Sequence, residues 1–300
     1  MYELLIQTPD TLSWRAEAPL WVHPVFIKSA AEMSNADAKL LLCYKGSQLF
    51  AAMPLYEKKL LGRKRLINPV GAYYQGLFFN WEDNMPPNRR LLDALQITGA
   101  LAKYLKSNYR KMQINLTPEI TDVRGFVWNG LKAKPLYTFT HDLAKPLQPL
   151  SDERKQLNRA VETGFVFGEE FVPMRYIELM KAMQTRKNHH TDMDYPRLAK
   201  HLDQLHEAGL MRQYNLYMGG NIVSANILLH NNTRTAYTIS RATDIEALKQ
   251  GASSWHSKCL IEALAGEFDY LDFCGANDPD VGRFKAALGL ELRLFFQIHT

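Results

Sequence analysis

The 300-residue sequence predicts an α+β protein with two similar domains, each a mixed, mainly antiparallel sheet flanked by helices. The first observation is order, because each half reads as a hairpin, another strand, a helix, a strand, a short helix and a last strand. The second is the stretch 142–151, which carries two prolines and no hydrophobic periodicity and is typical of a linker. We therefore expect domains at 1–145 and 146–300, a length that suffices for two ordinary domains.

The first half reads as a sheet interrupted by helices. Apolar runs at 40–44 and 49–56 surround Lys45-Gly46-Ser47, which predicts a hairpin. Prolines predict helix starts at Pro24 and after Pro86-Pro87, the second helix with apolar residues three or four positions apart. The expected elements are helices at 8–17, 24–33, after residue 86 and at 121–129, and strands at 40–44, 49–56, 66–70, 77–79, 112–116 and 131–140.

The second half contains the clearest sheet. Gly219-Gly220 and Asn231-Asn232 are two-residue hairpin turns between strands, which predicts three consecutive antiparallel strands. The expected elements are helices at 152–162, after Pro173, from Tyr195 to Gly209, at 253–265 and at 280–288, and strands at 165–171, 212–218, 222–230, 235–241, 270–273 and 290–297.

The composition is that of a soluble globular protein, with 46% hydrophobic and 22% charged residues. The formal net charge of +5 is compatible with a tRNA or nucleotide partner without requiring one, and we expect no DNA partner. No basic segment precedes a long apolar one at the N-terminus, and no window approaches about 18 uncharged apolar residues. We therefore expect no signal peptide, no membrane span and a cytoplasmic location, while the sequence does not predict the oligomeric state.

The cysteines and the absent motifs exclude several enzyme classes. Cys43, Cys259 and Cys274 are widely spaced without a CxxC pair, which is typical of buried thiols in a reducing compartment; a nucleophilic Cys274 is the alternative. The sequence has no GxSxG, GxxxxGK[ST], HExxH or GxGxxG motif, which argues against serine hydrolases, P-loop NTPases and Rossmann dehydrogenases.

Two polar segments have a plain and a functional interpretation. His189-His190 with Asp192 and Asp194 matches no standard ligand spacing, so we expect an exposed loop and no metal. The segment EKKLLGRKR, residues 57–65, carries five basic residues. We expect a solvated loop or edge strand there, with a phosphate contact as the alternative.

The first candidate site is the loop before the predicted helix at 253–265. Strand, loop and helix succeed one another, Gly251 allows a close backbone approach, and Ser253 and Ser254 can cap the helix. Free N–H groups at a helix start favour a phosphate. The expected cofactor-binding residues are Lys249, Gln250, Gly251, Ala252 and Ser253. The alternative is an ordinary capped helix.

The second candidate site is the turn Asp272-Phe273-Cys274-Gly275-Ala276-Asn277-Asp278-Pro279, which opens onto Phe284 and Lys285. A lysine beside a reacting carbonyl stabilises the negative charge that develops there. The alternative is a surface lysine next to a core phenylalanine.

Four segments of the second half resemble the GNAT superfamily, in particular its FemAB-like branch, the acyltransferases related to the Fem peptidyltransferases. They are AVETGFVF (160–167), NIVSANILLH (221–230), the helix after Gly251, and YLDFCGANDPDVGRFKAALG (270–289). The last resembles the family's Tyr-Asp-Phe-x-Gly segment followed by Phe-Lys and a glycine. In the first half the resemblance rests on domain order and on LINPVGAYYQGLFF (66–79).

The resemblance implies two tandem GNAT-like domains and transfer of an activated acyl or aminoacyl group to an amine. The donor is aminoacyl-tRNA in the peptidyltransferases and acyl-CoA in ordinary GNAT enzymes, so either is expected as a co-substrate and no tightly bound cofactor is. The acceptor would be a small-molecule or peptidoglycan-precursor amine. A non-catalytic ligand-binding protein of the same fold is the alternative function.

The resemblance also assigns residues. Lys285 and Phe284 match the family's Phe-Lys pair at the donor and acceptor site, whereas KQGAS at 249–253 departs from the usual pyrophosphate loop of CoA users. No charged heptad segment long enough for the helical arm of some Fem proteins is present.

Three further expectations concern the proton and the pocket walls. Asp272 is the candidate base or orienting residue for the attacking amine. Tyr237 and Arg241, on the central strand, are expected to line the pocket. Tyr73 and Tyr74 would line an acceptor cleft between the domains, with plain aromatic packing as the alternative.

Overall fold

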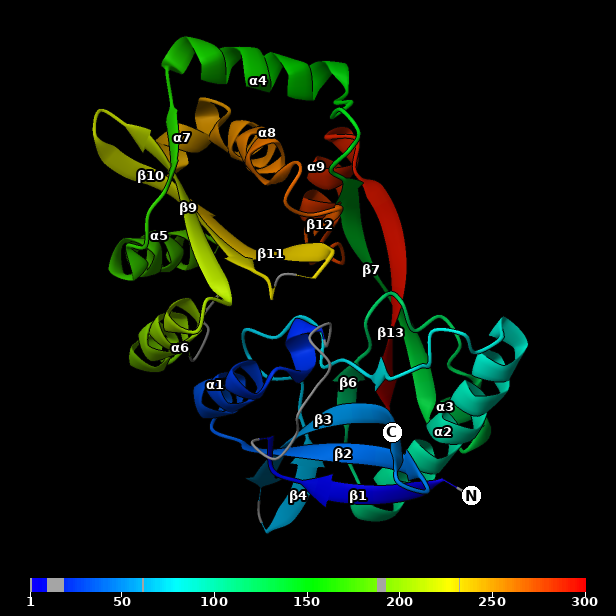
Figure 1. Ribbon diagram of the computed structural model, residues 1–300. Coiled ribbons are helices and arrows are strands. Elements are labelled where there is room, and N and C mark those ends of the chain that lie inside the picture. Colours follow the sequence, from blue (N-terminus) through cyan, green and yellow to red (C-terminus); the bar gives the residue numbers. More distant parts are fainter. Residues whose placement is uncertain (1, 10–18, 61, 188–192, 232) are drawn as a thin grey trace. The chain divides into compact units, whose positions relative to one another are not determined.

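The computed structural model describes residues 2–9, 19–60, 62–187, 193–231 and 233–300. Its chain divides into two compact units, the first of residues Met1–Leu136 with Leu294–Thr300 and the second of residues Tyr137–Arg293. Both units combine β-sheet with helices, as expected from the sequence (Figure 1).

The units do not divide in the proline-containing stretch at 142–151. The division falls inside β7 (Lys132–Asp142), and the end of β13 (Glu291–His299) returns to the first unit. These two strands have different partners at their two ends. The end of β7 pairs with β12 (Tyr270–Asp272), and the end of β13 pairs with β6 (Gln113–Asn115). A local proline signal marks a loop, whereas the division depends on pairing between residues far apart in sequence.

The first unit is built on antiparallel strands in the order β1-β2-β3-β4, with β5 also paired to β3. Its core joins the sheet to α2 through apolar side chains such as Leu41, Met53 and Leu101. The elements are β1 (Glu3–Gln7), η2 (Leu20–Val22), α1 (Pro24–Ser34), β2 (Asp37–Lys45), β3 (Gln48–Leu60), β4 (Arg63–Leu66), β5 (Phe78–Phe79), α2 (Pro87–Asn108), β6 and α3 (Arg124–Trp128).

Most predicted elements of the first unit are confirmed, including the hairpin whose turn places Gly46 at φ 61°. The predicted strand at 66–70 is wrong, because β4 ends at Leu66. The Asn68 amide donates to the carbonyl of Ala72 at 3.0 Å, and Pro69 has no N–H to offer a neighbouring strand, so the chain turns there. The predicted helix at 8–17 lies almost entirely outside the described residues.

The second unit contains strands in the order β7-β12-β11-β10-β9-β8. In Figure 1, α5 and α8 lie on opposite faces of this sheet. Its further elements are α4 (Ser151–Thr163), β8 (Val166–Glu169), α5 (Pro173–Arg186), α6 (Tyr195–Glu207), β9 (Met211–Met218), β10 (Asn221–Leu229), β11 (Thr235–Thr243), α7 (Ile245–Lys249), α8 (Ala252–Leu264) and α9 (Pro279–Ala287).

The three central antiparallel strands are confirmed, and Gly219 and Gly220 form the expected turn with φ of 56° and 78°. Asn232 of the second predicted turn lies outside the described residues. The pairing of β11 with β12 is parallel and short, and joins only Thr235–Tyr237 to Tyr270–Asp272. Beyond it β11 continues to Thr243 while β12 ends, so the two strands diverge.

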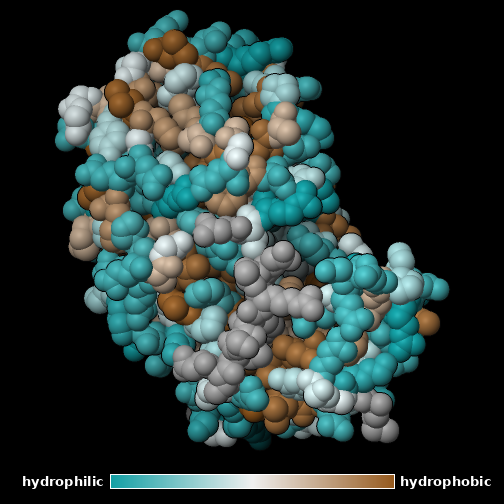
Figure 2. All heavy atoms as spheres, viewed as in Figure 1, coloured by the Kyte–Doolittle hydropathy of each residue, from teal (hydrophilic) through white to brown (hydrophobic). Residues whose placement is uncertain are grey.

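The surface is mixed in character. Figure 2 shows hydrophilic residues over most of the viewed face, with hydrophobic residues scattered among them. Within the described ranges, no helix combines the length and apolar character that crossing a membrane requires.

Candidate functional site

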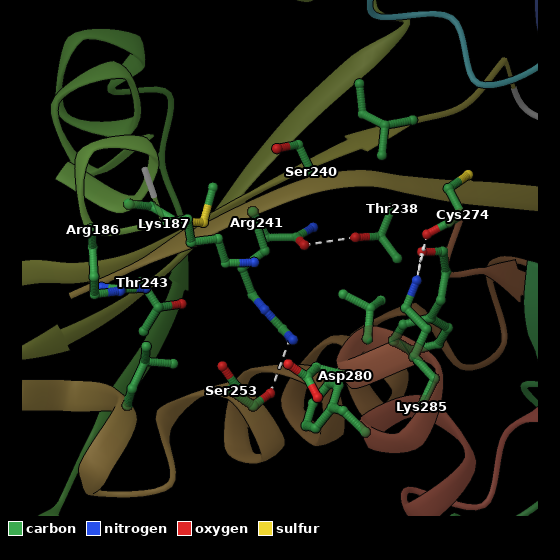
Figure 3. A pocket seen from close by; sticks show the side chains of 17 residues that line it. Arg186, Lys187, Thr238, Ser240, Arg241, Thr243, Ser253, Cys274, Asp280 and Lys285 are labelled. Carbon is green, nitrogen blue, oxygen red and sulfur yellow. Dashed lines mark hydrogen bonds between the residues drawn. The ribbon is translucent and has the colours of Figure 1, made fainter. Parts of the chain in front are cut away.

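A cavity of about 430 Å³ lies in the second unit, where β11 leaves β12 (Figure 3). This volume is within the range of small-molecule sites. Its walls come from the end of α5, from β10 and β11, from the first turn of α8, and from the turn and helix that follow β12. The lining residues are Met183, Arg186, Lys187, Asn226, Thr238, Ile239, Ser240, Arg241, Thr243, Leu248, Ser253, Phe273, Cys274, Asp280, Val281, Phe284 and Lys285.

The cavity is reached from both faces of the sheet. The hydroxyl of Ser240 accepts a hydrogen bond from Tyr176 of α5 at 2.8 Å, whereas the adjacent Arg241 donates to Ser257 of α8 at 2.6 Å. Neighbouring strand residues point to opposite faces. Residues of α5 and α8 nevertheless line one cavity. We infer that the sheet is open where β11 continues beyond its short pairing with β12.

The turn after β12 is held by local bonds. Cys274 and Gly275 both have positive φ, 39° and 78°, a conformation that glycine adopts readily. Asn277 exchanges hydrogen bonds of 3.0 and 3.1 Å with the backbone of Tyr137 on β7. Asp278 caps α9 by accepting from the amides of residues 280 and 281, and Pro279 is the first helical residue, as the sequence indicates.

Lys285 lies beside this turn and lines the cavity (Figure 3). Its ammonium donates to three backbone carbonyls, those of Phe273 at 2.6 Å, Cys274 and Gly275. The residue is 7% exposed. Burial, with a smaller contribution from Arg241, lowers the pKa of Lys285 to about 8. The three carbonyls hold the ammonium in place, and its pKa of about 8 lies close to neutral pH.

Arg241 also lines the cavity, and its side chain reaches from β11 to α8. Its guanidinium donates to the carbonyl of Ser253 at 3.0 Å and to the hydroxyl of Ser257, and lies 5.5 Å from the ring centroid of Phe284. Burial of the guanidinium lowers the pKa of Arg241 to about 10, so it is charged at neutral pH. Among the described residues, no carboxylate forms an ion pair with it.

Asp272 is 2% exposed and does not line the cavity. One of its carboxylate oxygens accepts from the hydroxyl of Thr138 at 2.5 Å and from the amide of Cys274 at 2.8 Å. These contacts suit an orienting residue of the turn. Burial raises the pKa of the Cys274 thiol well above its usual value, so this sulfur is a poor nucleophile at neutral pH.

The loop at 249–253 is in contact with α4 at Gly251 and at the carbonyl of Lys249. The carbonyl of Lys249 accepts from Arg159 at 2.9 Å, and a Cβ on Gly251 would stand 2.1 Å from the carbonyl oxygen of Gln156. Of the five predicted cofactor-binding residues, only Ser253 lines the cavity; Lys249 and Gln250 are exposed, and Gly251 and Ala252 are buried.

The predicted serine cap of this helix is wrong. Gly251 is the N-cap in a left-handed conformation, with φ 81° and no side-chain cap bond. The hydroxyl of Ser254 instead donates to Glu153 of α4 at 2.5 Å.

The three predicted tyrosines do not line the cavity. Tyr237 is 7% exposed and is the register partner of Asp272, at the end of the β11–β12 pairing. Tyr73 and Tyr74 belong to the first unit and pack edge-on against Phe295, with ring centroids 5.6 and 5.2 Å away. Within that unit they form an aromatic cluster.

The sequence interpretation missed several cavity residues. Asn226 of β10 is 1% exposed, and its side-chain oxygen accepts from Thr238 at 2.6 Å. A signal was present, because Ser224 and Asn226 are the polar residues, two positions apart, in the otherwise apolar run 222–229. Arg186 is the last residue of α5, Lys187 follows it, and Asp280 lies in the first turn of α9; their convergence has no local sequence signal.

The basic segment at 57–65 forms the hairpin of β3 and β4. Lys58 and Arg65 are direct cross-strand partners and line a separate hollow of about 800 Å³ in the first unit, together with Lys111 and Lys134. Among the described residues that line it, none is an aspartate or glutamate. The phosphate-contact interpretation stays a prediction for this basic hollow.

His189, His190 and Asp192 of the predicted exposed loop lie outside the described residues. In the described part of the chain, no group of three or more His, Cys, Asp or Glu side chains is placed to hold a metal ion.

Residues 148–286 match the family model described as an acetyltransferase (GNAT) domain. Among solved structures, FemX aligns over 89% of this chain and 90% of its own, with 13% identity and a TM-score of 0.65. Residues 148–286 thus resemble a GNAT domain, and the chain as a whole has the fold of FemX.

Two further structures share this tandem GNAT fold. A tandem GNAT protein from the clavulanic acid biosynthesis pathway covers 99% of this chain and 98% of its own, with 11% identity and a TM-score of 0.53. The C-terminal domain of a putative lysylphosphatidylglycerol synthetase from Agrobacterium fabrum covers 92% and 89%, with 14% identity and a TM-score of 0.54. No curated protein sequence matches the chain significantly. The fold supports acyl or aminoacyl transfer in general.

Proposed function

We propose that this protein is an N-acyltransferase that moves an acyl or aminoacyl group from an activated donor to an amine. The observation that carries this proposal is the cavity where β11 diverges from β12, open to both faces of the sheet and flanked by two desolvated cations, Lys285 and Arg241. An opening of this kind lets a donor and an acceptor meet from opposite sides.

The chemistry asks little of the protein beyond position and charge. The amine nitrogen attacks the acyl carbon, an amide bond forms, the ester or thioester bond breaks, and the amine proton leaves with a base or the departing group. Negative charge develops on the carbonyl oxygen during attack, and preorganised cations stabilise it. Lys285 is suited to this role because three carbonyls hold its ammonium in one place.

Two carboxylates divide the remaining work in this proposal. Asp272 orients the turn, because it accepts the Cys274 amide and so sets the carbonyls that hold Lys285. Asp280 is exposed and lines the cavity, which makes it the carboxylate available to accept the amine proton.

The donor we favour is an aminoacyl ester carried by tRNA rather than acyl-CoA. A CoA donor would place its pyrophosphate at the start of α8, where Gly251 is in contact with the backbone of α4. The acceptor we propose is a small-molecule or peptidoglycan-precursor amine, and the protein works in the cytoplasm. The lysyl group in the name of the Agrobacterium relative supports an aminoacyl donor.

A non-catalytic ligand-binding protein of the same fold is the second candidate. The observation that favours it is that the three hydrogen-bond donors of the Lys285 ammonium are all taken by backbone carbonyls. In that case Lys285 would shape a binding pocket and touch no reacting atom.

Donor-dependent stabilisation and turnover separate these candidates. Thermal unfolding is measured with CoA, acetyl-CoA, uncharged tRNA and aminoacyl-tRNA, and transfer of a radiolabelled acyl group to a mixture of amines is followed in parallel. We expect stabilisation and transfer with aminoacyl-tRNA. Transfer from acetyl-CoA would refute the donor assignment, and ligand binding without any transfer would support the second candidate.

A further inference from the structure

The charges around the cavity are strongly one-sided. Four cationic side chains line it, whereas Asp280 is its single carboxylate residue among those described. Asp280 is exposed and lies 4.0 Å from Arg283 on its own helix. The cations are Arg186, Lys187, Arg241 and Lys285.

Arg241 is the cation whose charge has least compensation. Its guanidinium is desolvated, yet its hydrogen-bond partners are a carbonyl and a hydroxyl, both neutral. Desolvated charges in proteins are normally paired, because an unpaired one raises the free energy of the fold. Neither partner needs the arginine, since the Ser257 hydroxyl also donates to the Ser253 carbonyl at 3.0 Å. Apart from the Phe284 ring, whose centroid lies 5.5 Å from the guanidinium, the side chain thus has no contact that explains a structural role.

A second cavity side chain also lacks a partner. Asn226 is the direct cross-strand neighbour of Arg241 and is 1% exposed. Its oxygen is occupied by Thr238, but in the described part of the chain its buried nitrogen donates to no acceptor. Buried amide donors without an acceptor are rare, because each lowers the stability of the fold. An arginine without a counter-ion and an amide without an acceptor thus stand side by side.

We infer that the substrate seated in this cavity carries an anionic group, a carboxylate or a phosphate, which Arg241 and Asn226 receive. A planar guanidinium binds two oxygens of such a group at once, and the free N–H of the amide supplies a further donor. This inference rests on the proposed transfer function and narrows it, since at least one of the two substrates must be an anionic acid or ester. The anion supplies the counter-charge that the protein lacks.

Binding of small anions tests the inference without turnover. Isothermal titration and thermal unfolding are carried out with N-acetylglycine, L-glutamate and glycerol 3-phosphate, and with N-acetylglycinamide and glycerol as neutral matches. We expect at least one anion to bind more than tenfold tighter than its neutral match. If no anion binds more tightly than its neutral match, the inference fails, whether or not the protein transfers acyl groups.

Three variants localise the binding. Arg241→Met and Asn226→Asp should each weaken anion binding at least tenfold, the second because a carboxylate then neutralises Arg241. Arg212→Met is the matched control, because it removes an arginine paired with Glu267 on the same sheet at 2.8 Å and should leave anion binding unchanged.

Stability separates a receptor from a structural arginine. Arg241→Met should unfold at the same temperature as the native protein or a higher one, because it removes an uncompensated charge. A lower unfolding temperature with undiminished anion binding would overturn the inference.

The source of the anion is found by competition. An anion that competes with the amine but not with the acyl donor lies on the acceptor, and the reverse pattern places it on the donor. If anions bind at Arg241 but no donor is ever turned over, the inference stands and the proposed function fails.

Discussion

Lys285→Met should change the pH dependence of stability by an amount that follows from the burial of its ammonium. The pKa of Lys285 is about 8 in the fold and 10.5 as the ordinary value. Between these values the unfolded chain binds the proton more tightly than the fold, so raising the pH favours the fold. The charged form of Lys285 therefore destabilises the native protein below pH 8, and this destabilisation disappears toward pH 10.5.

The size of the effect follows from the two pKa values. Each unit of pKa difference corresponds to about 1.4 kcal/mol, so the native protein should gain about 2 kcal/mol of unfolding free energy from Lys285 between about pH 7.5 and pH 10. Lys285→Met lacks this gain. The stability difference between the native protein and the variant should thus shift by about 2 kcal/mol in favour of the native protein over this range.

Urea unfolding at the two pH values measures this shift directly. All other titratable groups are present in both proteins, so their contribution cancels in the difference. Lys155→Met is the control, because the Lys155 side chain is 75% exposed and should show no such pH dependence. If the native protein and Lys285→Met differ in unfolding free energy by the same amount at both pH values, burial does not destabilise the Lys285 ammonium and the reasoning is refuted.

Three further variants test the charge of Lys285, the contact of Gly251 with α4, and the basic hollow of the first unit. Lys285→Arg should move the alkaline limb of the kcat/KM profile, expected near pH 8 in the native enzyme, to higher pH, because only the protonated cation stabilises the carbonyl oxygen; an unmoved limb contradicts this role. Gly251→Ala should cost about 2–5 kcal/mol in urea unfolding, through its positive φ and the α4 carbonyl 2.1 Å from the new Cβ, against about 1–2 kcal/mol for Gly209→Ala, which has open space. Equal losses would show that α4 does not press on this loop. Lys134→Met in the basic hollow should weaken tripolyphosphate binding and flatten its salt dependence. The control Lys103→Met, at an exposed lysine outside the hollow, should do neither. If the two variants bind tripolyphosphate equally, the hollow is an ordinary solvated surface.

Local chemistry was enough to predict the turn that follows β12. Gly275 permits a left-handed residue, and Asp278-Pro279 is a helix start by side-chain capping and by its fixed φ. Lys285 could be placed beside that turn because a short helix brings it back by two turns. Such features depend on residues within a few positions of one another, which is why the sequence shows them.

The walls of the cavity depend on pairing that the sequence does not display. Tyr237 and Arg241 were expected in the pocket because they lie on the central strand, and in a regular strand they would share a face. The register of β10 and β11 shifts at Ile227 and Leu228, so Ile239 is an extra residue and Tyr237 turns away. Asn226 meets Arg241 only through the antiparallel register.

The packing of α4 against Gly251 could not be predicted from the sequence either. The loop at 249–253 has the local signature of a phosphate site, but α4 lies about a hundred residues earlier and packs onto it. A glycine at such a loop favours close approach, and the sequence alone does not tell whether a ligand or another helix makes that approach.

Transfer of a labelled aminoacyl group tests the central claim most directly. Aminoacyl-tRNA carrying a radiolabelled amino acid is incubated with the protein and a mixture of amines, and alkali-stable labelled amide is quantified. The account predicts amide formation that depends on the protein and falls at least tenfold in Lys285→Met but not in Lys155→Met. Amide formation that is equal in Lys285→Met and the native protein, or absent with aminoacyl-tRNA and acetyl-CoA alike, would contradict it.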